Sequence, residues 1–547
     1  MKKIYILFYF YAFAGYSQIT LVRDIFPGTT AAVPPATTPT INSGNPTNFL
    51  DFNGTILFRA TNGSNGVELW KSDGTNAGTQ MILDINTIST IPNSNPASLT
   101  LFQNQVFFNA SSGTTAPGTG QELYKTDGTT TGTALVTDLN PGTAAGNPFN
   151  LVVLNPTTLM FGGNNGVTGS ELFKTDGTAA GTVNVFDASG TSNSASWIEN
   201  LNGTAIIGYT VTGGTGRELY RSTGAVGNCD LILDINPGTA NGVGSVSYTA
   251  LNNVFFTANS GTTGTELWKT NGTTAGTSLV RDIRPGTDSS SPNNFAILGT
   301  NIYFSANGGV NGLELWKSDG TTAGTVEVLD LNVGSTNSNP DKLTTIGTKL
   351  YYFAAPDASG TDLYVFDGTT NLKLLDLNAT TGSAYNTNFV SLGGLVYFAV
   401  DSSDADTKRE LWQTDGTASG TVPVVPLSSL NQNATDINNI TLSGGKLYFS
   451  GEVLDGVELY SYTPLLLSKS DFTKSTILVF PNPTTGMVQI VGLENTSYSY
   501  EISDISGKLI QSGNVTDNQV NINAGFGIYF LKIKTAEGFV VKKIMKN

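Results

Sequence analysis

The chain has 547 residues, of which 63 are glycine and 13% are charged, and it contains no histidine and one cysteine, Cys229. Without histidine there is no Ser-His-Asp triad and no histidine-ligated zinc site. One cysteine forms neither an intrachain disulfide nor a thiolate metal cluster. The formal net charge of −15 argues against nucleic acid as a partner, because a negative surface repels phosphates.

Residues 1–17 have the pattern of a secretory signal peptide. Lys2 and Lys3 form a basic start, residues 4–14 are apolar, and Gly15 and Ser17 are small residues suited to cleavage. The apolar run is too short to cross a bilayer comfortably, and no later segment has 18 consecutive apolar residues. We therefore predict an exported protein without a transmembrane segment in its mature form. A buried first strand is the alternative.

From residue 20 to about residue 463 a Glu-Leu-aromatic phrase recurs, usually followed by Asp-Gly-Thr-x-x-Gly-Thr. Glu266 and Glu314 occupy equivalent positions in successive repeats. The number of residues between them is the same, or nearly the same, for most successive repeats of the array. A fixed period of about 48 residues indicates stacked supersecondary units that bury their cores against one another. The nine repeats are marked by Glu68, Glu122, Glu171, Glu218, Glu266, Glu314, Asp362, Glu410 and Glu458.

One repeat contains four short apolar runs separated by turn residues. Around Glu314 these runs are residues 294–297, 302–306, 313–318 and 326–331. Four antiparallel strands within one such period are what a β-propeller blade needs. We therefore predict an all-β fold. It consists of a multi-bladed β-propeller of nine four-stranded repeats, each of about 48 residues, followed by a small C-terminal β-sandwich.

The two ends of the repeat array complement each other. Residues 21–29 are similar in sequence to residues 279–287, which form the last strand of a repeat. The ninth repeat lacks a segment of this kind. We predict that residues 21–25 complete the ninth blade and close a ring, which removes exposed sheet edges. An open or spiral array of the same units is the alternative.

The Asp-Gly-Thr turn has a local explanation. Its Asp can accept hydrogen bonds from nearby backbone amides, and its glycines can adopt positive φ. Asn271 and Thr223 replace the Asp in two repeats and can keep a side-chain acceptor, which suits capping better than metal binding. We therefore expect no metal or other cofactor, with calcium as the alternative. The predicted structural turn residues are Asp73, Asp127, Asp176, Asp319, Asp367 and Asp415.

Other recurrent residues also suit structural roles. The repeated Glu is predicted to accept hydrogen bonds between blades, since catalysis needs one special site rather than nine similar ones. Asp138, Asp234 and Asp282 precede Pro-Gly turns and are predicted to bind turn amides, with calcium again as the alternative. Cys229 stands where other repeats carry a turn Thr, so we predict a structural role.

Functional residues are sought on the face opposite the Asp-Gly-Thr turns, where three loops depart from the repeat. These loops are residues 30–47, 111–121 and 401–409. Each is either a binding element or a neutral loop extension. The third loop supplies the candidate ligand-binding residues, which are Asp401, Asp404, Asp406 and Arg409.

The C-terminal segment breaks the period. A Ser-, Lys- and Thr-rich linker, residues 468–476, is followed by the motif residues Pro481, Asn482, Pro483 and Gly486 and by alternating short strands. This segment resembles the C-terminal sorting domain of proteins exported by the type IX secretion system. The resemblance implies a β-sandwich that the outer-membrane export machinery reads, and cargo that is attached to the cell surface or released.

The repeats resemble the ELWxxDGT-repeat family of bacterial secreted and surface proteins. Residues 68–79, 314–325 and 410–421 match its pattern throughout. The resemblance implies a propeller-like extracellular protein and no defined activity. The predicted organisation is therefore a signal peptide (1–17), a repeat propeller (18–467), a linker (468–476) and a sorting domain (477–547).

These features favour a secreted or surface-attached binding or adhesion scaffold, for glycans or surface proteins, over an enzyme. A polysaccharide-active enzyme would need paired carboxylates, for which Asp401, Asp404 and Asp406 are the candidates. A purely structural surface component is the third hypothesis. The sequence identifies no catalytic residue, ligand or oligomeric state.

Overall fold

The computed structural model describes residues 19–30, 40–88, 92–167, 169–186, 194–211, 214–358, 360–377, 388–401, 408–424, 435–453, 456–464, 478–491, 498–504, 508–515, 517–535 and 538–547. They divide into two compact units, one within Ser17–Thr463 and one within Pro464–Asn547. The predicted signal peptide and linker lie outside the described residues. The regular secondary structure of the described part consists of β-strands, and none of its segments is a helix able to cross a membrane.

The larger unit contains nine four-stranded antiparallel sheets among its described residues, and in eight of them the strands follow chain order. The first four sheets are β4 (Thr47–Phe52), β5 (Thr55–Thr61), β6 (Val67–Ser72) and β7 (Gln80–Leu83); β8 (Ala97–Phe102), β9 (Gln105–Ser111), β10 (Gln121–Thr126) and β11 (Ala134–Thr137); β12 (Phe149–Asn155), β13 (Thr158–Asn164), β14 (Ser170–Thr175) and β15 (Val183–Phe186); and β16 (Ser194–Leu201), β17 (Thr204–Val211), β18 (Gly216–Ser222) and β19 (Asp230–Leu233). The next four are β20 (Val243–Ala250), β21 (Asn253–Asn259), β22 (Thr265–Thr270) and β23 (Ser278–Arg281); β24 (Asn293–Leu298), β25 (Asn301–Asn307), β26 (Leu313–Ser318) and β27 (Val326–Leu329); β28 (Asp341–Ile346), β29 (Lys349–Asp357), β30 (Gly360–Phe366) and β31 (Asn371–Leu375); and β32 (Val390–Leu392), β33 (Leu395–Val400), β34 (Glu410–Thr414) and β35 (Val422–Pro423).

The ninth sheet joins the two ends of the repeat array. Its strands are β36 (Thr435–Ser443), β37 (Lys446–Val453), β38 (Gly456–Tyr462) and, at the far edge, β1 (Ile19–Arg23). Strand β1 pairs antiparallel with β38, with Ile19 opposite Tyr462 and Leu21 opposite Tyr460. The N-terminal strand therefore joins the ninth sheet as predicted, but it spans Ile19–Arg23 rather than residues 21–25.

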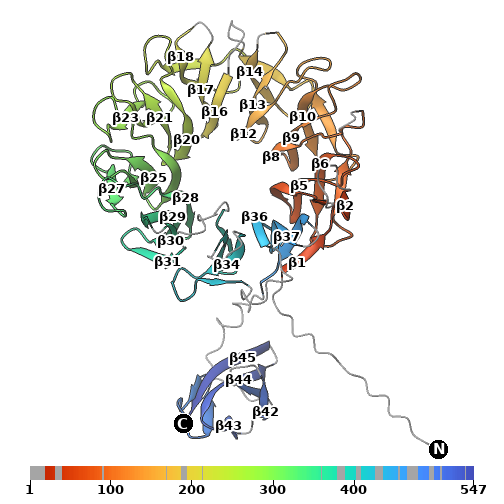
Figure 1. Cartoon of the computed structure of the whole chain (residues 1–547), viewed down its shortest axis with the longest axis vertical. Helices are drawn as coiled ribbons and strands as arrows, with labels where there is room; N and C mark the ends of the chain where they lie inside the picture. Colours follow the sequence, from red (N-terminus) through yellow and green to blue (C-terminus); the bar gives the residue numbers. More distant parts are fainter. Residues whose placement is uncertain are drawn as a thin grey trace, which may run out of the picture. The chain divides into compact units, whose positions relative to one another are not determined.

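The sheets stand side by side around a central opening (Figure 1). Their first strands are innermost: β4 lies beside β8, β24 beside β28, and β36 beside β4. Fourth strands such as β23 and β27 lie on the outside. The prediction of an all-β fold is confirmed, and the arrangement is propeller-like.

The core of the unit lies between neighbouring sheets. On the second strand of one sheet, Ile56, Leu57 and Phe58 are all fully buried, because both faces of the sheet are covered. Phe58 and Trp70 share a cluster with Tyr448 from the ninth sheet. This two-sided burial explains why the second strands are continuous apolar runs rather than alternating ones.

The recurrent glutamates connect each sheet to the next. Glu266 accepts hydrogen bonds from the backbone N–H groups of Ile283 and Ser290 (both 2.9 Å) and from Ser290 Oγ (2.5 Å). Glu458 does the same across the ends of the array, with Ile25 N at 2.8 Å and Gly44 N at 2.6 Å. The predicted role as acceptors between repeats is confirmed.

The Asp-Gly-Thr turns also contact the preceding sheet. Asp319 Oδ1 accepts hydrogen bonds from Thr321 N (2.8 Å) and Thr321 Oγ1 (2.7 Å). Lys269 Nζ, from the preceding sheet, donates to Gly320 O at 2.7 Å. Asp73, Asp127, Asp176, Asp367 and Asp415 bind the Thr two positions later in the same way.

The fourth repeat departs from this pattern. Asn271 in the fifth repeat accepts the same two bonds as the aspartates, but the side chain of Thr223 acts as a donor toward the described residues. Its N and Oγ1 both donate to Asn228 Oδ1 at 2.7 Å, because Asn228 carries the stronger carbonyl acceptor. Cys229 is buried beside it, and burial raises the pKa of its thiol to about 12.

The smaller unit has two sheets around one core. They are β42 (Leu509–Asn514), β41 (Ser499–Asp504), β44 (Gly527–Thr535) and β45 (Gly538–Lys546), and β39 (Leu478–Phe480), β40 (Met487–Val491) and β43 (Gln519–Asn521). Ile490 and Val520 of the small sheet share a buried cluster with Ile502 and Leu531 of the large one. In the larger unit, a two-stranded ribbon of β2 (Thr29–Thr30) and β3 (Thr40–Ile41) completes the described strands.

The turn geometry predicts different outcomes for two substitutions at one position. Asp319→Ala removes the acceptor for Thr321 and should lower the free energy of unfolding by about 1 kcal/mol, by analogy with helix-cap deletions. Asp319→Asn should be nearly neutral, because Asn271 accepts the same two bonds. Thermal and urea denaturation of both variants measure the difference; equal stability of the two would contradict the capping role.

The buried glutamates predict a pH dependence of stability. Burial raises the pKa of Glu68, Glu122, Glu218 and Glu458 from 4.5 to about 7. Their stabilisation is therefore complete below pH 4.5 and lost as pH rises through 7. The melting temperature should therefore fall as the pH rises from 4.5 to 7. This fall should be shallower in the Glu122→Gln variant, because its side-chain amide cannot ionise. Melting temperatures that rise across this interval would contradict the prediction.

Candidate functional site

The predicted acidic loop is only partly described. Asp401, at the end of β33, is 1% exposed. Arg409 donates through Nε to Asp436 Oδ1 at 2.9 Å, which ties it to the neighbouring sheet. Asp404 and Asp406 lie outside the described residues. The described members of this candidate site are thus a buried carboxylate and an ion-paired guanidinium.

The other two candidate loops differ in what they bind: residues 111–121 bond partly within the loop, whereas residues 42–47 bond to the ninth and first sheets, for example through Asn45 N to Val457 O at 3.0 Å. In residues 111–121, Gly120 N donates to Gly113 O at 2.9 Å and Gly118 N donates to Thr115 O at 2.7 Å. In residues 30–47, strands β2 and β3 form a ribbon whose tip lies outside the described residues.

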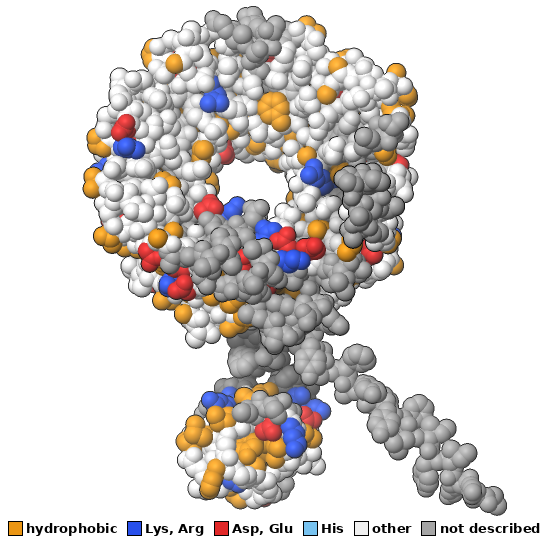
Figure 2. All heavy atoms as spheres, viewed as in Figure 1, with side chains coloured by type: hydrophobic (Ala, Val, Ile, Leu, Met, Phe, Trp, Pro, Cys, Tyr) orange, Lys and Arg blue, Asp and Glu red, His pale blue; other side chains and the backbone are white. Residues whose placement is uncertain are grey.

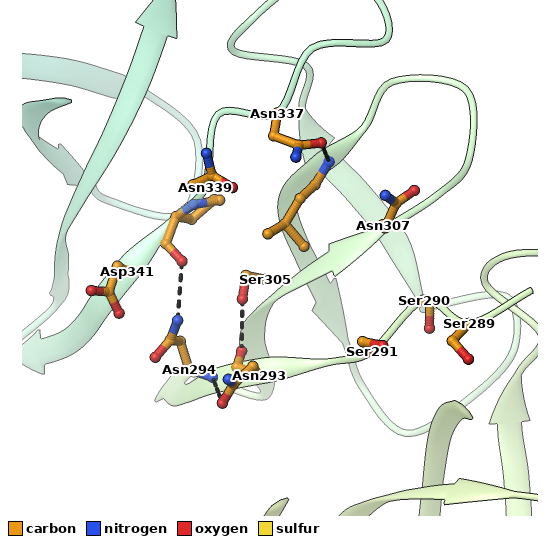
Figure 3. Close-up of a pocket in the computed structure, with 12 residues that line it drawn as sticks. Ser289, Ser290, Ser291, Asn293, Asn294, Ser305, Asn307, Asn337, Asn339 and Asp341 are labelled. Atoms are coloured by element: carbon orange, nitrogen blue, oxygen red, sulfur yellow. Dashed lines mark hydrogen bonds between the residues drawn. The ribbon is translucent and has the colours of Figure 1, made fainter. Parts of the chain in front are cut away.

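A pocket that the sequence did not predict lies between the sheets β24–β27 and β28–β31 (Figure 3). Its volume is about 460 Å³. The pocket lies on the side of the larger unit that carries the β25–β26 loop. The Asp-Gly-Thr turns are at the opposite ends of the strands. The lining residues are Ser289, Ser290, Ser291, Asn293, Asn294, Ser305, Asn307, Leu313, Asn337, Asn339, Pro340 and Asp341.

The buried glutamates position two walls of this pocket. Glu266 binds Ser290 as described above, and Glu314 Oε1 accepts a hydrogen bond from Ser338 N at 2.7 Å. The next residue in each wall, Ser291 or Asn339, has a positive φ of 48° or 49°. The sequence signal was the recurrent Ser-Ser-Pro and Ser-Asn-Pro segments at residues 290–292 and 338–340, which follow the turns at Pro285-Gly286 and Val333-Gly334.

The walls are held by hydrogen bonds that use one end of each side-chain amide. Asn294 Nδ2 donates to Pro340 O at 3.2 Å across the pocket. Asn337 Oδ1 accepts from Leu313 N at 2.8 Å, and Asn307 Oδ1 accepts from Gly309 N at 2.7 Å. The Nδ2 groups of Asn307 and Asn337 are then placed to act as donors to a ligand.

The pocket is nearly uncharged. Asp341 is the one ionisable side chain among its described lining residues. Its other polar groups are amides and hydroxyls, with Leu313 and Pro340 as apolar surface. It therefore offers hydrogen-bond donors and acceptors, with one carboxylate among its described lining residues.

The aspartates before the Pro-Gly turns cap those turns. Gly142 N donates to Asp138 Oδ2 at 3.1 Å, and Gly286 N donates to Asp282 Oδ2 at 3.4 Å. Asp330, which precedes a Val-Gly turn, accepts a hydrogen bond from Gly334 N at 3.1 Å in the same way. The Oδ1 atoms of these three aspartates are buried without a hydrogen-bond partner among the described residues. In that part of the chain no group of three His, Cys, Asp or Glu residues is arranged to hold a metal ion.

The predicted sorting motif binds to the last strand of the smaller unit. Asn482 Nδ2 donates to Lys543 O at 2.7 Å, and Asn482 Oδ1 accepts from Met545 N at 2.8 Å. Residues 478–547 match the family model of the secretion system C-terminal sorting domain. The C-terminal unit is a type IX sorting domain. The protein is therefore secreted or attached to the outer cell surface.

Comparison with solved structures finds distant likenesses to the larger unit. The β-propeller domain of the Trilobed protease from Pyrococcus furiosus has a TM-score of 0.34 at 12% identity, over 70% of this chain and 97% of that one. A prolyl endopeptidase has a TM-score of 0.38 at 11% identity, over 66% of this chain and 54% of its own. A puromycin hydrolase has a TM-score of 0.35 at 12% identity, over 66% of this chain and 60% of the hydrolase chain. The chain thus spans little more than half of the two hydrolases. No curated protein matches the sequence.

The turn aspartates predict a result for metal removal. Because the Oδ2 atoms of Asp138 and Asp330 already cap turns, EDTA should leave the melting temperature of the full chain unchanged. Differential scanning calorimetry with EDTA, with added Ca²⁺ and with neither measures this. A fall in EDTA that Ca²⁺ reverses would show instead that the buried Oδ1 atoms hold calcium.

Proposed function

We propose that this protein is an exported, non-enzymatic binding scaffold whose larger unit is a closed nine-bladed β-propeller of the ELWxxDGT type. Support for the closed ring comes from the pairing of β1 with β38. Further support comes from Glu458, which repeats across the ends of the array the bonds that Glu266 makes within it. Support for export comes from the C-terminal sorting domain.

The pocket between β24–β27 and β28–β31 supports a neutral glycan as the ligand. Its volume of about 460 Å³ is within the range of small-ligand sites. Sugar hydroxyls both donate and accept hydrogen bonds, which matches a wall of Asn and Ser side chains. A strongly charged ligand would need opposite charges that the described lining does not supply, and a hydrolase would need a second carboxylate near Asp341.

Two isosteric substitutions test this proposal. Asn307→Asp and Asn337→Asp keep the side-chain oxygen that accepts a hydrogen bond from Gly309 N or Leu313 N. Each substitution replaces the Nδ2 donor with a second oxygen. Each should weaken binding of neutral oligosaccharides up to roughly tenfold, since a typical hydrogen bond contributes about 0.5–1.5 kcal/mol net. Glycan arrays identify a ligand, and isothermal titration calorimetry measures its affinity.

Asn259→Asp is the matched control. Asn259 occupies the position of Asn307 in the preceding repeat, and its Oδ1 accepts a hydrogen bond from Gly261 N at 2.7 Å. It is not among the residues that line this pocket. The affinity of this variant should equal that of the unmodified protein. A blank array, or equal affinity of all three variants, would contradict glycan binding at this site. Release of reducing sugar from a polysaccharide would favour the enzyme hypothesis.

A further inference from the structure

The outer face of the large sorting-domain sheet carries apolar side chains in contact with solvent. Along β44, Tyr529, Leu531 and Ile533 point into the core and are buried, whereas the alternate residues Ile528 and Phe530 are exposed. Phe530 keeps 37% of its surface accessible. A strand with one buried face normally carries polar residues on its other face, so these apolar residues need another explanation.

Neighbouring strands extend this apolar surface. In the register of β44 with β45, Ile528 is opposite Met545 and Phe530 is opposite Lys543. Cross-strand partners point to the same side of a sheet, so Met545 lies on the outer face and is exposed. Leu509 of β42, which is opposite Ser503, is also exposed. We call Leu509, Ile528, Phe530 and Met545 the outer apolar patch.

Basic residues border the outer apolar patch. Lys543 is opposite Phe530, and Lys532 is opposite Val541. Lys532 and Lys534 approach the same carboxylate, that of Glu501, at 3.7 Å and 3.9 Å. Two lysines therefore share one acid, and among the described residues the border has a positive excess. Figure 2 shows hydrophobic and basic side chains next to one another on the smaller unit.

The charge of this unit contrasts with that of the rest of the chain. Residues 478–547 contain six lysines and five acids, which gives a formal charge of +1, whereas the whole chain carries −15. An apolar surface with a basic border complements a protein surface that is apolar with an acidic border. Exposed apolar patches of this kind mark interaction sites in soluble proteins.

We propose that the outer apolar patch and Lys543 are the surface by which a protein of the type IX export machinery, apolar with an acidic border, binds this chain. The contact is made by one face of β42, β41, β44 and β45. Asn482 contributes indirectly, since its bonds to Lys543 O and Met545 N fix the last strand. The inference is independent of the ligand of the larger unit.

Export of the full chain from a bacterium with a type IX system tests the proposal. Phe530→Thr keeps a residue with high strand propensity but removes the apolar ring, and it should lower the secreted fraction at least tenfold. Met487→Thr is the matched control, because Met487 is also exposed but belongs to the small sheet. It should be exported like the unmodified chain. Limited proteolysis of the purified chains confirms that both variants are folded.

The charge component is tested separately. Lys543→Glu should lower export as Phe530→Thr does, whereas Lys543→Arg should not. Normal export of Phe530→Thr, or an equal loss in Met487→Thr, would overturn the proposal. So would a dimer of the unmodified chain that Phe530→Thr dissociates in gel filtration, which would assign the patch to self-association. Binding to phosphatidylglycerol vesicles that Phe530→Thr abolishes would assign it to a lipid surface.

Discussion

A buried carboxylate that accepts backbone hydrogen bonds from two places in the chain is the interaction on which the larger unit depends. Among the described residues, the Glu or Asp of seven of the nine repeats accepts a hydrogen bond from a backbone N–H just after the fourth strand of its own sheet. In most of these repeats it also binds the residue that leads into the next sheet. An ionised acid in this position loses hydration, so burial raises the pKa of Glu68 to about 7. The amide and hydroxyl donors around it offset that cost.

The same interaction shapes the candidate site. Ser290 and Ser338 are held by Glu266 and Glu314, and the residues that follow them turn into the pocket. The pocket walls are therefore fixed by buried side chains rather than by the loops themselves. A site positioned in this way is pre-organised, so a ligand does not have to order flexible segments when it binds.

The sequence predicted the repeated elements much better than the site. The regular period, the strand-like runs and the complementary ends at residues 21–25 and 458–460 are local patterns, and the structure has strands at these places. The pocket depends on which residues two neighbouring sheets bring together. Asn293 and Asp341 come from successive repeats and are ordinary polar residues in each of them, so no local pattern marked them. The acidic loop was conspicuous by composition, yet Asp401 is buried and Arg409 is paired with Asp436.

The position of β1 has a consequence for biogenesis. The bond between Ile25 and Glu458 joins residues 433 apart, so this contact forms only after nearly the whole array has been synthesised. The sorting domain follows that contact in the chain, after the predicted linker. A product truncated before the ninth sheet therefore also lacks the sorting domain, so the signal for export is added only after the residues that join the two ends of the array.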